Sequence, residues 1–286
     1  MTLIDARNFY RKMLSRCYSK NEIDFYFKIL INSFFNWDST MIALNPEKQL
    51  SKFQSNKLIK TIKYLQIYKP IQYITGESFF MGLKFKVNKN VLIPRQETEE
   101  LVEWIINDNP NSKKKIHVID IGTGSGCIAV SLSSKKRNFN LTATDNSKES
   151  LFVAKENARF NKVKINFIYK DILKPFNDKI TYDIIVSNPP YITSDEINNI
   201  EAKVLNFEPH NAIFVDKKTP LIFYKAILDF SILNLKDDGE IYFEINPVFS
   251  SLLLTLIDSY NKFDVMVKKD ISKKNRMIRL KKKNEY

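Results

Sequence analysis

Cysteine and histidine are scarce in this chain of 286 residues, which contains two of each. The histidines, His117 and His210, lie far apart in the sequence, and they form no cluster with Cys17 or Cys127 that has the spacing of metal ligands, so no zinc site is expected. No apolar run reaches the length that a membrane-spanning helix needs. Residues 1–5 lack the charged-then-apolar pattern of a secretion signal. Together these absences favour a protein of the reducing cytoplasm that has no membrane partner.

Acidic residues are also in deficit, because 45 Lys and Arg stand against 32 Asp and Glu and give a net charge of +13. A basic balance suits a nucleic-acid or ribosomal partner. An AT-rich genome would produce the same bias, since it enriches Lys, Asn, Ile and Phe and depletes glycine, of which there are 6. The charge therefore does not require direct nucleic-acid binding, while a hydrophobic content of 44% permits a real core.

The periodicity of apolar residues changes near residue 76. Residues 1–75 show helical spacing, as in Leu58, Ile62 and Leu65, and predict a bundle of helices. Residues 76–95 combine glycines with alternating apolar and polar side chains, which indicates a β-hairpin followed by a linker. We therefore expect a helical domain, a connecting hairpin and a third, larger domain.

Residues 96–286 alternate between helix-like and strand-like segments, which predicts an α/β domain with a mainly parallel sheet covered by helices on both faces. The last two expected strands would add an antiparallel edge and make the sheet mixed. The expected strands are 116–120, 140–144, 165–169, 182–187, 240–245, 265–268 and 277–280.

The tetrapeptide Asn188-Pro189-Pro190-Tyr191 directly follows one of these apolar strands. Prolines donate no backbone N–H and restrict the residue before them, so the loop should be stiff and rich in acceptors. Two fixed acceptors, the Asn188 side-chain oxygen and a neighbouring carbonyl, could hold a planar NH2 group. The simpler alternative is a proline-rich turn that closes a strand, with Tyr191 filling the core rather than packing on a substrate amide.

A glycine loop at residues 120–126 follows the first expected strand and precedes a helix. Its Gly-x-Gly-x-Gly spacing, with Asp120 before it, fits a cofactor with an amino-acid moiety and a ribose better than a pyrophosphate. Asp145 follows the next strand and could accept ribose hydroxyls, although it could also be a helix N-cap. Asp171 is placed to contact an adenine edge. The residues expected to bind the cofactor are Asp120, Gly122, Thr123, Gly124, Gly126, Asp145, Asp171 and Asn188.

With these motifs the chain resembles the class I S-adenosylmethionine-dependent methyltransferases and, more narrowly, the peptide chain release factor glutamine methyltransferases. The resemblance covers nearly the whole chain and is carried by residues 73–77, 82–85, 91–99, 120–126, 143–145, 188–192 and 207–209. It implies a Rossmann-like domain with a mixed seven-stranded sheet, S-adenosyl-L-methionine as cofactor, and methylation at N5 of the glutamine in the Gly-Gly-Gln motif of release factors. It also implies that the helical domain helps to bind the release factor.

The resemblance assigns the catalytic role to Asn188, Pro189 and Tyr191 and substrate binding to these residues together with Pro190. Three positions depart from the family pattern, because Asn246 and the segments 215–218 and 272–276 lack its usual glycines. The alternative function is a nucleic-acid methyltransferase that acts on an exocyclic base amine, which the same two acceptors at Asn188 would hold.

Overall fold

The computed structural model describes residues 1–110, 113–175 and 180–283. The chain divides into two compact units, one formed by Met1–Glu77 with Glu201–Phe207 and the other by Ser78–Ile200 with Glu208–Tyr286. No helix within the described residues is long and apolar enough to cross a membrane.

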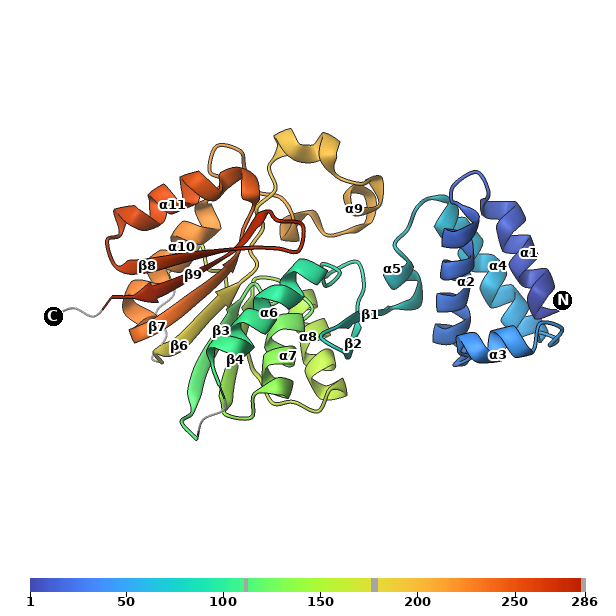
Figure 1. Cartoon of the computed structure of the whole chain (residues 1–286), viewed down its shortest axis with the longest axis horizontal. Coiled ribbons are helices and arrows are strands. Elements are labelled where there is room, and N and C mark those ends of the chain that lie inside the picture. Colours follow the sequence, from blue (N-terminus) through green and yellow to red (C-terminus); the bar gives the residue numbers. More distant parts are fainter. Residues whose placement is uncertain (111–112, 176–179, 284–286) are drawn as a thin grey trace. The chain divides into compact units, whose positions relative to one another are not determined.

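The first unit is a bundle of helices, which confirms the prediction for this part of the chain (Figure 1). Thr2, Ser19 and Ser51 each form a capping box that satisfies exposed N–H groups at the start of a long helix. The apolar faces share one core, in which the Tyr10 hydroxyl donates to the Leu58 carbonyl at 2.7 Å. The helices are α1 (Leu3–Leu14), α2 (Lys20–Phe35), α3 (Ser39–Leu44), α4 (Lys52–Gln66), α5 (Ile71–Thr75) and α9 (Ala202–Phe207).

A mixed seven-stranded sheet forms the centre of the second unit, with strand order β5-β4-β3-β6-β7-β9-β8 (Figure 1). The strands pair in parallel from β5 through β4, β3 and β6 to β7, whereas β9 pairs antiparallel with both β7 and β8. This is the predicted fold class. The strands of the sheet are β3 (Ile116–Ile121), β4 (Phe139–Asp145), β5 (Asn166–Tyr169), β6 (Tyr182–Ser187), β7 (Leu235–Glu244), β8 (Phe263–Lys269) and β9 (Asn275–Lys282).

Helices cover both faces of the sheet because neighbouring side chains of each central strand point to opposite sides. In β3, Val118 packs in the core beneath α6, α7 and α8, whereas Ile119 packs in the core beneath α10 and α11. The covering helices are α6 (Gln96–Asp108), α7 (Cys127–Lys135), α8 (Lys148–Phe160), α10 (Ile222–Asn234) and α11 (Ser250–Ser259). Three short 3₁₀ turns are η1 (Ser194–Asn199), η2 (His210–Ala212) and η3 (Pro247–Phe249).

Element boundaries agree best where the strand is buried on both faces. Strand β6 spans the predicted residues, but β7 begins at Leu235 rather than at the predicted residue 240. Residues 236–239 hid the start of β7, because they carry no apolar pattern and form a bulge between the pairs Tyr182–Leu235 and Ile184–Glu240. No apolar periodicity in the sequence predicted the short α3.

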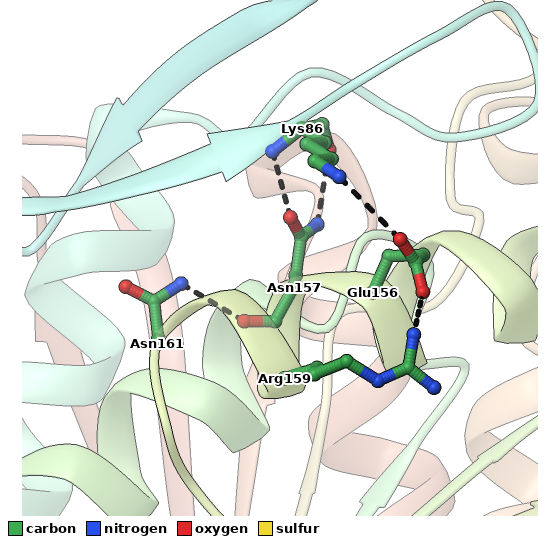
Figure 2. Close-up of polar contacts among 5 residues, drawn as sticks. All are labelled: Lys86, Glu156, Asn157, Arg159 and Asn161. Carbon is green, nitrogen blue, oxygen red and sulfur yellow. Dashed lines mark hydrogen bonds and ion pairs between the residues drawn. The ribbon is translucent and has the colours of Figure 1, made fainter.

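The hairpin formed by β1 (Glu77–Phe80) and β2 (Leu83–Lys86) is tied to the sheet layer through α8. Figure 2 shows how the side chain of Asn157 turns towards the backbone of Lys86. Its Oδ1 accepts from the Lys86 N–H at 2.7 Å, and its Nδ2 donates to the carbonyls of Lys86 and Ser125, each at 2.9 Å. One buried amide therefore joins the hairpin to the glycine loop.

Candidate active site

A pocket lies at the carboxyl ends of β3, β4 and β6, where parallel sheets usually bind ligands. All of its lining residues belong to the second unit. Of the residues singled out in the sequence, those that line it are Gly122, Thr123, Gly124, Asp145, Asp171, Asn188, Pro189 and Pro190. Those that do not line it are Asp120, Gly126 and Tyr191.

The glycine loop presents its backbone to the pocket. Gly124 has φ +55°, which favours glycine, and a Cβ at this position would meet no atom within 4 Å, so the loop faces open space. Gly126 has φ +80° and a different role, because a Cβ there would lie 3.1 Å from Ala154 Cβ. Gly124 therefore leaves room for a ligand, and Gly126 lets α7 start close to α8.

Asp120 lies just beneath this loop and is completely buried. Its Oδ2 accepts from the Thr123 hydroxyl at 2.6 Å, while its Oδ1 has no hydrogen-bond partner in the described structure. Burial raises the pKa of Asp120 to about 7, and the Thr123 hydrogen bond partly opposes that shift. A buried carboxylate oxygen without a partner is costly, so this site is built to receive a donor.

Asp145 ends β4 and is held by two backbone groups. Its Oδ2 accepts from the Gly124 N–H at 2.8 Å and its Oδ1 from the Ser147 N–H at 2.9 Å. The N-cap of α8 is Ser147, so the alternative that Asp145 caps this helix is wrong. Asp171 is half-buried beyond β5, and its Oδ1 accepts from the Leu173 N–H at 3.0 Å.

The other end of the pocket is formed by the loop that follows β6. Asn188 Nδ2 donates to Thr98 Oγ1 at 3.1 Å, whereas Asn188 Oδ1 accepts no hydrogen bond from the described residues. The carbonyl oxygen of Pro189 is likewise without a donor in the described part of the chain. The amide clamp, meaning Asn188 Oδ1 with the Pro189 carbonyl, thus offers two acceptors at the pocket.

Tyr191 turns away from the pocket. Its hydroxyl donates to Glu244 Oε1 at 2.9 Å, and its ring packs against the core beneath α10 and α11. Burial raises the pKa of Tyr191 well above its ordinary value, and the charge of Glu244 adds to the shift. The phenol therefore stays protonated and acts as a donor to Glu244.

Similar sequences occur in bacterial proteins. The chain is 40% identical to the release factor glutamine methyltransferase of Flavobacterium psychrophilum, over 98% of this chain and 99% of that protein. It is 37% identical to the same-named protein of Bacteroides thetaiotaomicron, over 94% and 96% of the two chains. Residues 98–207 match the family model of the methyltransferase small domain.

The chain belongs to the release factor glutamine methyltransferases.

Solved structures with less than 25% identity agree on the fold of this family member. The METTL16 methyltransferase domain superposes with a TM-score of 0.53 at 20% identity, over 71% of this chain and 89% of that chain. A methyltransferase from Pyrococcus furiosus gives 0.50 at 16% identity, over 71% and 90%. The predicted class I methyltransferase fold is confirmed.

The cofactor of this class of enzyme is S-adenosyl-L-methionine, and the pocket residues suit it. The open space beside Gly124 allows a ligand to approach the backbone. Asp120 does not line the pocket, but its buried Oδ1, which has no hydrogen-bond partner among the described residues, is available to a positively charged amino group beneath the loop. Asp145 Oδ1 and Oδ2 each accept one N–H, so each keeps a lone pair for a ribose hydroxyl. No group of three or more His, Cys, Asp or Glu among the described residues could hold a metal ion.

Two parts of this site were missed by the sequence analysis. Residues 90–95, taken as a linker, form one wall of the pocket. Buried Glu208 fixes that wall, because its Oε1 bonds Arg95 Nη2 at 2.5 Å and its Oε2 accepts from the Ile93 N–H at 3.3 Å. The second part that was missed is Glu244. An acidic residue at the end of an apolar strand is unusual, and this placement could have marked Glu244 as a functional residue.

The departures from the family pattern have different structural consequences. Asn246 has φ −77°, so its backbone does not need glycine. Its Nδ2 instead donates to the Tyr191 carbonyl at 3.1 Å and to both oxygens of Glu196 at 3.0 Å. Lys273, by contrast, has φ +63° in the turn before β9, a conformation that favours the missing glycine.

Proposed function

We propose that the protein transfers a methyl group from S-adenosyl-L-methionine to the side-chain amide nitrogen of the glutamine in the Gly-Gly-Gln motif of peptide chain release factors. The observation that carries the proposal is the amide clamp, whose two acceptors have no donor in the described structure. Membership of the family supports this choice of substrate, and the relatives do not favour the nucleic-acid alternative. Release factors act where proteins are translated, so the reaction belongs in the cytoplasm.

The cofactor-binding role is proposed for the residues at the β3 and β4 end of the pocket. Asp120 would hold the amino group, Asp145 the ribose hydroxyls and Asp171 the adenine edge, while the glycine loop approaches with its backbone. The residues with this proposed role are Asp120, Gly122, Thr123, Gly124, Gly126, Asp145, Asp171 and Asn188. When bound, S-adenosyl-L-methionine supplies an electrophilic methyl group on a sulfonium.

An amide nitrogen is a weak nucleophile because its lone pair is delocalised, and the clamp addresses this weakness by orientation. Asn188 Oδ1 and the Pro189 carbonyl would accept the two N–H groups of the glutamine amide and fix its plane. Both hydrogen bonds strengthen as positive charge develops on nitrogen, so they stabilise the transition state more than the ground state. Pro190 keeps the loop stiff.

No titratable side chain is hydrogen-bonded directly to Asn188 in the described structure, so general-base catalysis is not proposed. Cys127 also lines the pocket, but burial raises its pKa to about 12, and the thiol is therefore no ready nucleophile. Tyr191 was expected to pack on the substrate amide, but its hydroxyl is bonded to Glu244. We therefore propose that Tyr191 supports the loop through Glu244.

The division of labour between residues 1–75, 76–95 and 96–286 is part of the same proposal, with the first segment recognising the release factor. Its α4 carries four lysines and no acidic residue, and Lys60 and Lys63 are exposed. Reversing both charges should raise KM for the release factor several-fold through weaker steering, with unchanged cofactor affinity. The matched control reverses the charges of the exposed Lys162 and Lys164 in the second unit, and an equal effect of this control would contradict the assignment.

The decisive experiment supplies purified protein with labelled S-adenosyl-L-methionine and, separately, a release factor, the same factor with Gly-Gly-Gln changed to Gly-Gly-Asn, and RNA. We expect label only in the unchanged release factor, and fragment mass spectrometry should place the methyl on the glutamine side chain. Label in RNA but not in the release factor would overturn the proposal.

A further inference from the structure

A chain of hydrogen bonds joins the amide clamp to a buried carboxylate. Asn188 Nδ2 donates to Thr98 Oγ1 at 3.1 Å, and Thr98 Oγ1 donates to Glu244 Oε2 at 2.6 Å. The three residues come from the end of β6, from α6 and from β7. Thr98 is 3% exposed and Glu244 2%, so water does not compete for these bonds.

The direction of this chain is set by the number of protons. An ionised carboxylate only accepts, and a hydroxyl has a single hydrogen to give. The Thr98 hydroxyl therefore donates its hydrogen to Glu244 and can only accept from Asn188. Asn188 must accordingly turn its NH2 group towards Thr98. The oxygen of the same planar amide then faces the other way.

The orientation matters because a primary amide has nearly the same shape after a half turn about its last bond. With Oδ1 towards the substrate, Asn188 accepts an N–H of the glutamine amide. With Nδ2 towards the substrate, two NH2 groups would face each other and no hydrogen bond would form. The packing of Asn188 alone does not distinguish the two states.

Glu244 also holds the far end of the loop. Its Oε1 accepts from Tyr191 at 2.9 Å, and its backbone carbonyl accepts from Tyr224 at 3.0 Å. Burial raises the pKa of Glu244 above its usual range, and the negative charge of Glu97 raises it further. Three interactions lower this pKa and so oppose the shift: the hydrogen bonds from Thr98 and Tyr191 and the positive charge of Arg276. Both carboxylate oxygens are thus occupied by donors from the surroundings of the clamp.

We propose that Thr98 and Glu244 are positioning residues that fix the amide of Asn188 with its oxygen towards the substrate nitrogen. This inference rests on the proposed function and adds the device that orients the clamp. Thr98 lines the pocket, but its hydroxyl is engaged by Asn188 and Glu244 and acts through Asn188. Glu244 acts through Thr98 and Tyr191.

The test compares Thr98→Val, which keeps the shape but removes the hydroxyl, with Thr98→Ser, which keeps the hydroxyl. In Thr98→Val, kcat on a release factor should fall about 10- to 100-fold, because the amide of Asn188 is then misoriented most of the time, while KM and the affinity for S-adenosylhomocysteine change little. Thr98→Ser should restore most of the turnover. Turnover of Thr98→Val within about twofold of the unchanged protein, or no rescue by serine, would overturn the proposal.

A second readout does not depend on methyl transfer. The side-chain NH2 signals of Asn188, identified by their loss in Asn188→Asp, should exchange slowly with solvent in the unchanged protein and in Thr98→Ser and much faster in Thr98→Val. If the unchanged protein fails to methylate release factors but shows this pattern, the proposed function fails while the orientation device stands. If methylation occurs and the NH2 signals of Thr98→Val remain protected, the orientation device is wrong.

Glu244→Gln tests the origin of the direction. Glutamine can donate to Thr98, which frees the Thr98 hydrogen for Asn188 Oδ1 and favours the reversed amide. We expect kcat to fall in this variant. In the unchanged protein kcat should also decline at low pH, as Glu244 becomes protonated, and this decline should be absent from Glu244→Gln. A Glu244→Gln variant that keeps this decline and full turnover would contradict the proposal, and Thr98→Val provides the same test if Glu244→Gln does not fold.

Discussion

Carboxylates (Asp145 and Asp171) line the end of the pocket proposed to bind the cofactor, whereas the neutral amide of Asn188 lines the end proposed to bind the substrate. Asp145 is held by the backbone N–H groups of Gly124 and Ser147, but Asn188 is held by the side chain of Thr98. Backbone donors keep their direction whatever the protonation of their neighbours. The orientation of Asn188 depends instead on a hydroxyl and a buried carboxylate. Changes at the first end should therefore alter affinity, and changes at the second should alter turnover.

The largest effect is expected at the substrate end. Asn188→Ala removes one acceptor of the clamp but leaves the prolines and the cofactor end in place. Because the lost hydrogen bond strengthens as charge develops, kcat should fall by about 10²–10³ while KM rises less. Single-turnover kinetics on a release factor measure the change, with S-adenosylhomocysteine affinity as the control. Near-normal turnover would show that residues 188–191 are only a turn that closes β6, and that Asn188 does not orient the substrate.

The corresponding change at the cofactor end is Asp145→Ala. Each hydrogen bond from a ribose hydroxyl to a buried carboxylate is worth about 1.5–3 kcal/mol, so affinity for S-adenosylhomocysteine should fall at least about tenfold. Calorimetry measures the affinity, and thermal unfolding checks that the loop around Gly124 is intact. An affinity equal to that of the unchanged protein would exclude Asp145 from the site.

A pH series probes Asp120 at the same end. Its pKa of about 7 in the free protein lies above the ordinary value for a carboxyl group, so the side chain is ionised only above that pH. A positively charged amino group needs the ionised form, and affinity for S-adenosylhomocysteine should therefore be constant at higher pH and fall by up to about tenfold per pH unit below it. In Asp120→Asn the affinity should be weak and nearly independent of pH. An unchanged affinity across this range would show that Asp120 does not contact the ligand.

The smallest effect is expected at Asn246, which braces the loop after the clamp from behind. Asn246→Gly restores the residue usual in the family but loses the hydrogen bonds to Tyr191 and Glu196, at a cost of about 1–2 kcal/mol of folding stability. Turnover should change by no more than about threefold, because Glu244 still holds the Tyr191 hydroxyl. Asn246→Ala separates loss of the amide from the added freedom of glycine. A large drop in kcat in both variants would show that the loop depends on Asn246 more than on Glu244.

Much of the fold was predictable because its signals are local. Apolar spacing identified the helical unit, and unbroken apolar runs identified β3 and β6 nearly to the residue. The start of β7 was not predictable, since Leu235 joins the sheet only by pairing with Tyr182 and is separated from the apolar part of the strand by a bulge at residues 236–239. The short α3 gave too few turns for a periodicity to appear.

The sequence by itself determined the chemistry available at the strand ends, because the glycine loop, Asp145 and the Asn188-Pro189 dipeptide each directly follow a recognisable strand. Only the tertiary structure decided how that chemistry is oriented. It turned Tyr191 towards Glu244, left Asp120 Oδ1 without a partner among the described residues, and brought Thr98 and Glu244 from distant parts of the chain to Asn188. The physical reason is that a local pattern specifies backbone conformation, whereas the direction of a hydrogen bond depends on which buried donor and acceptor the fold brings together.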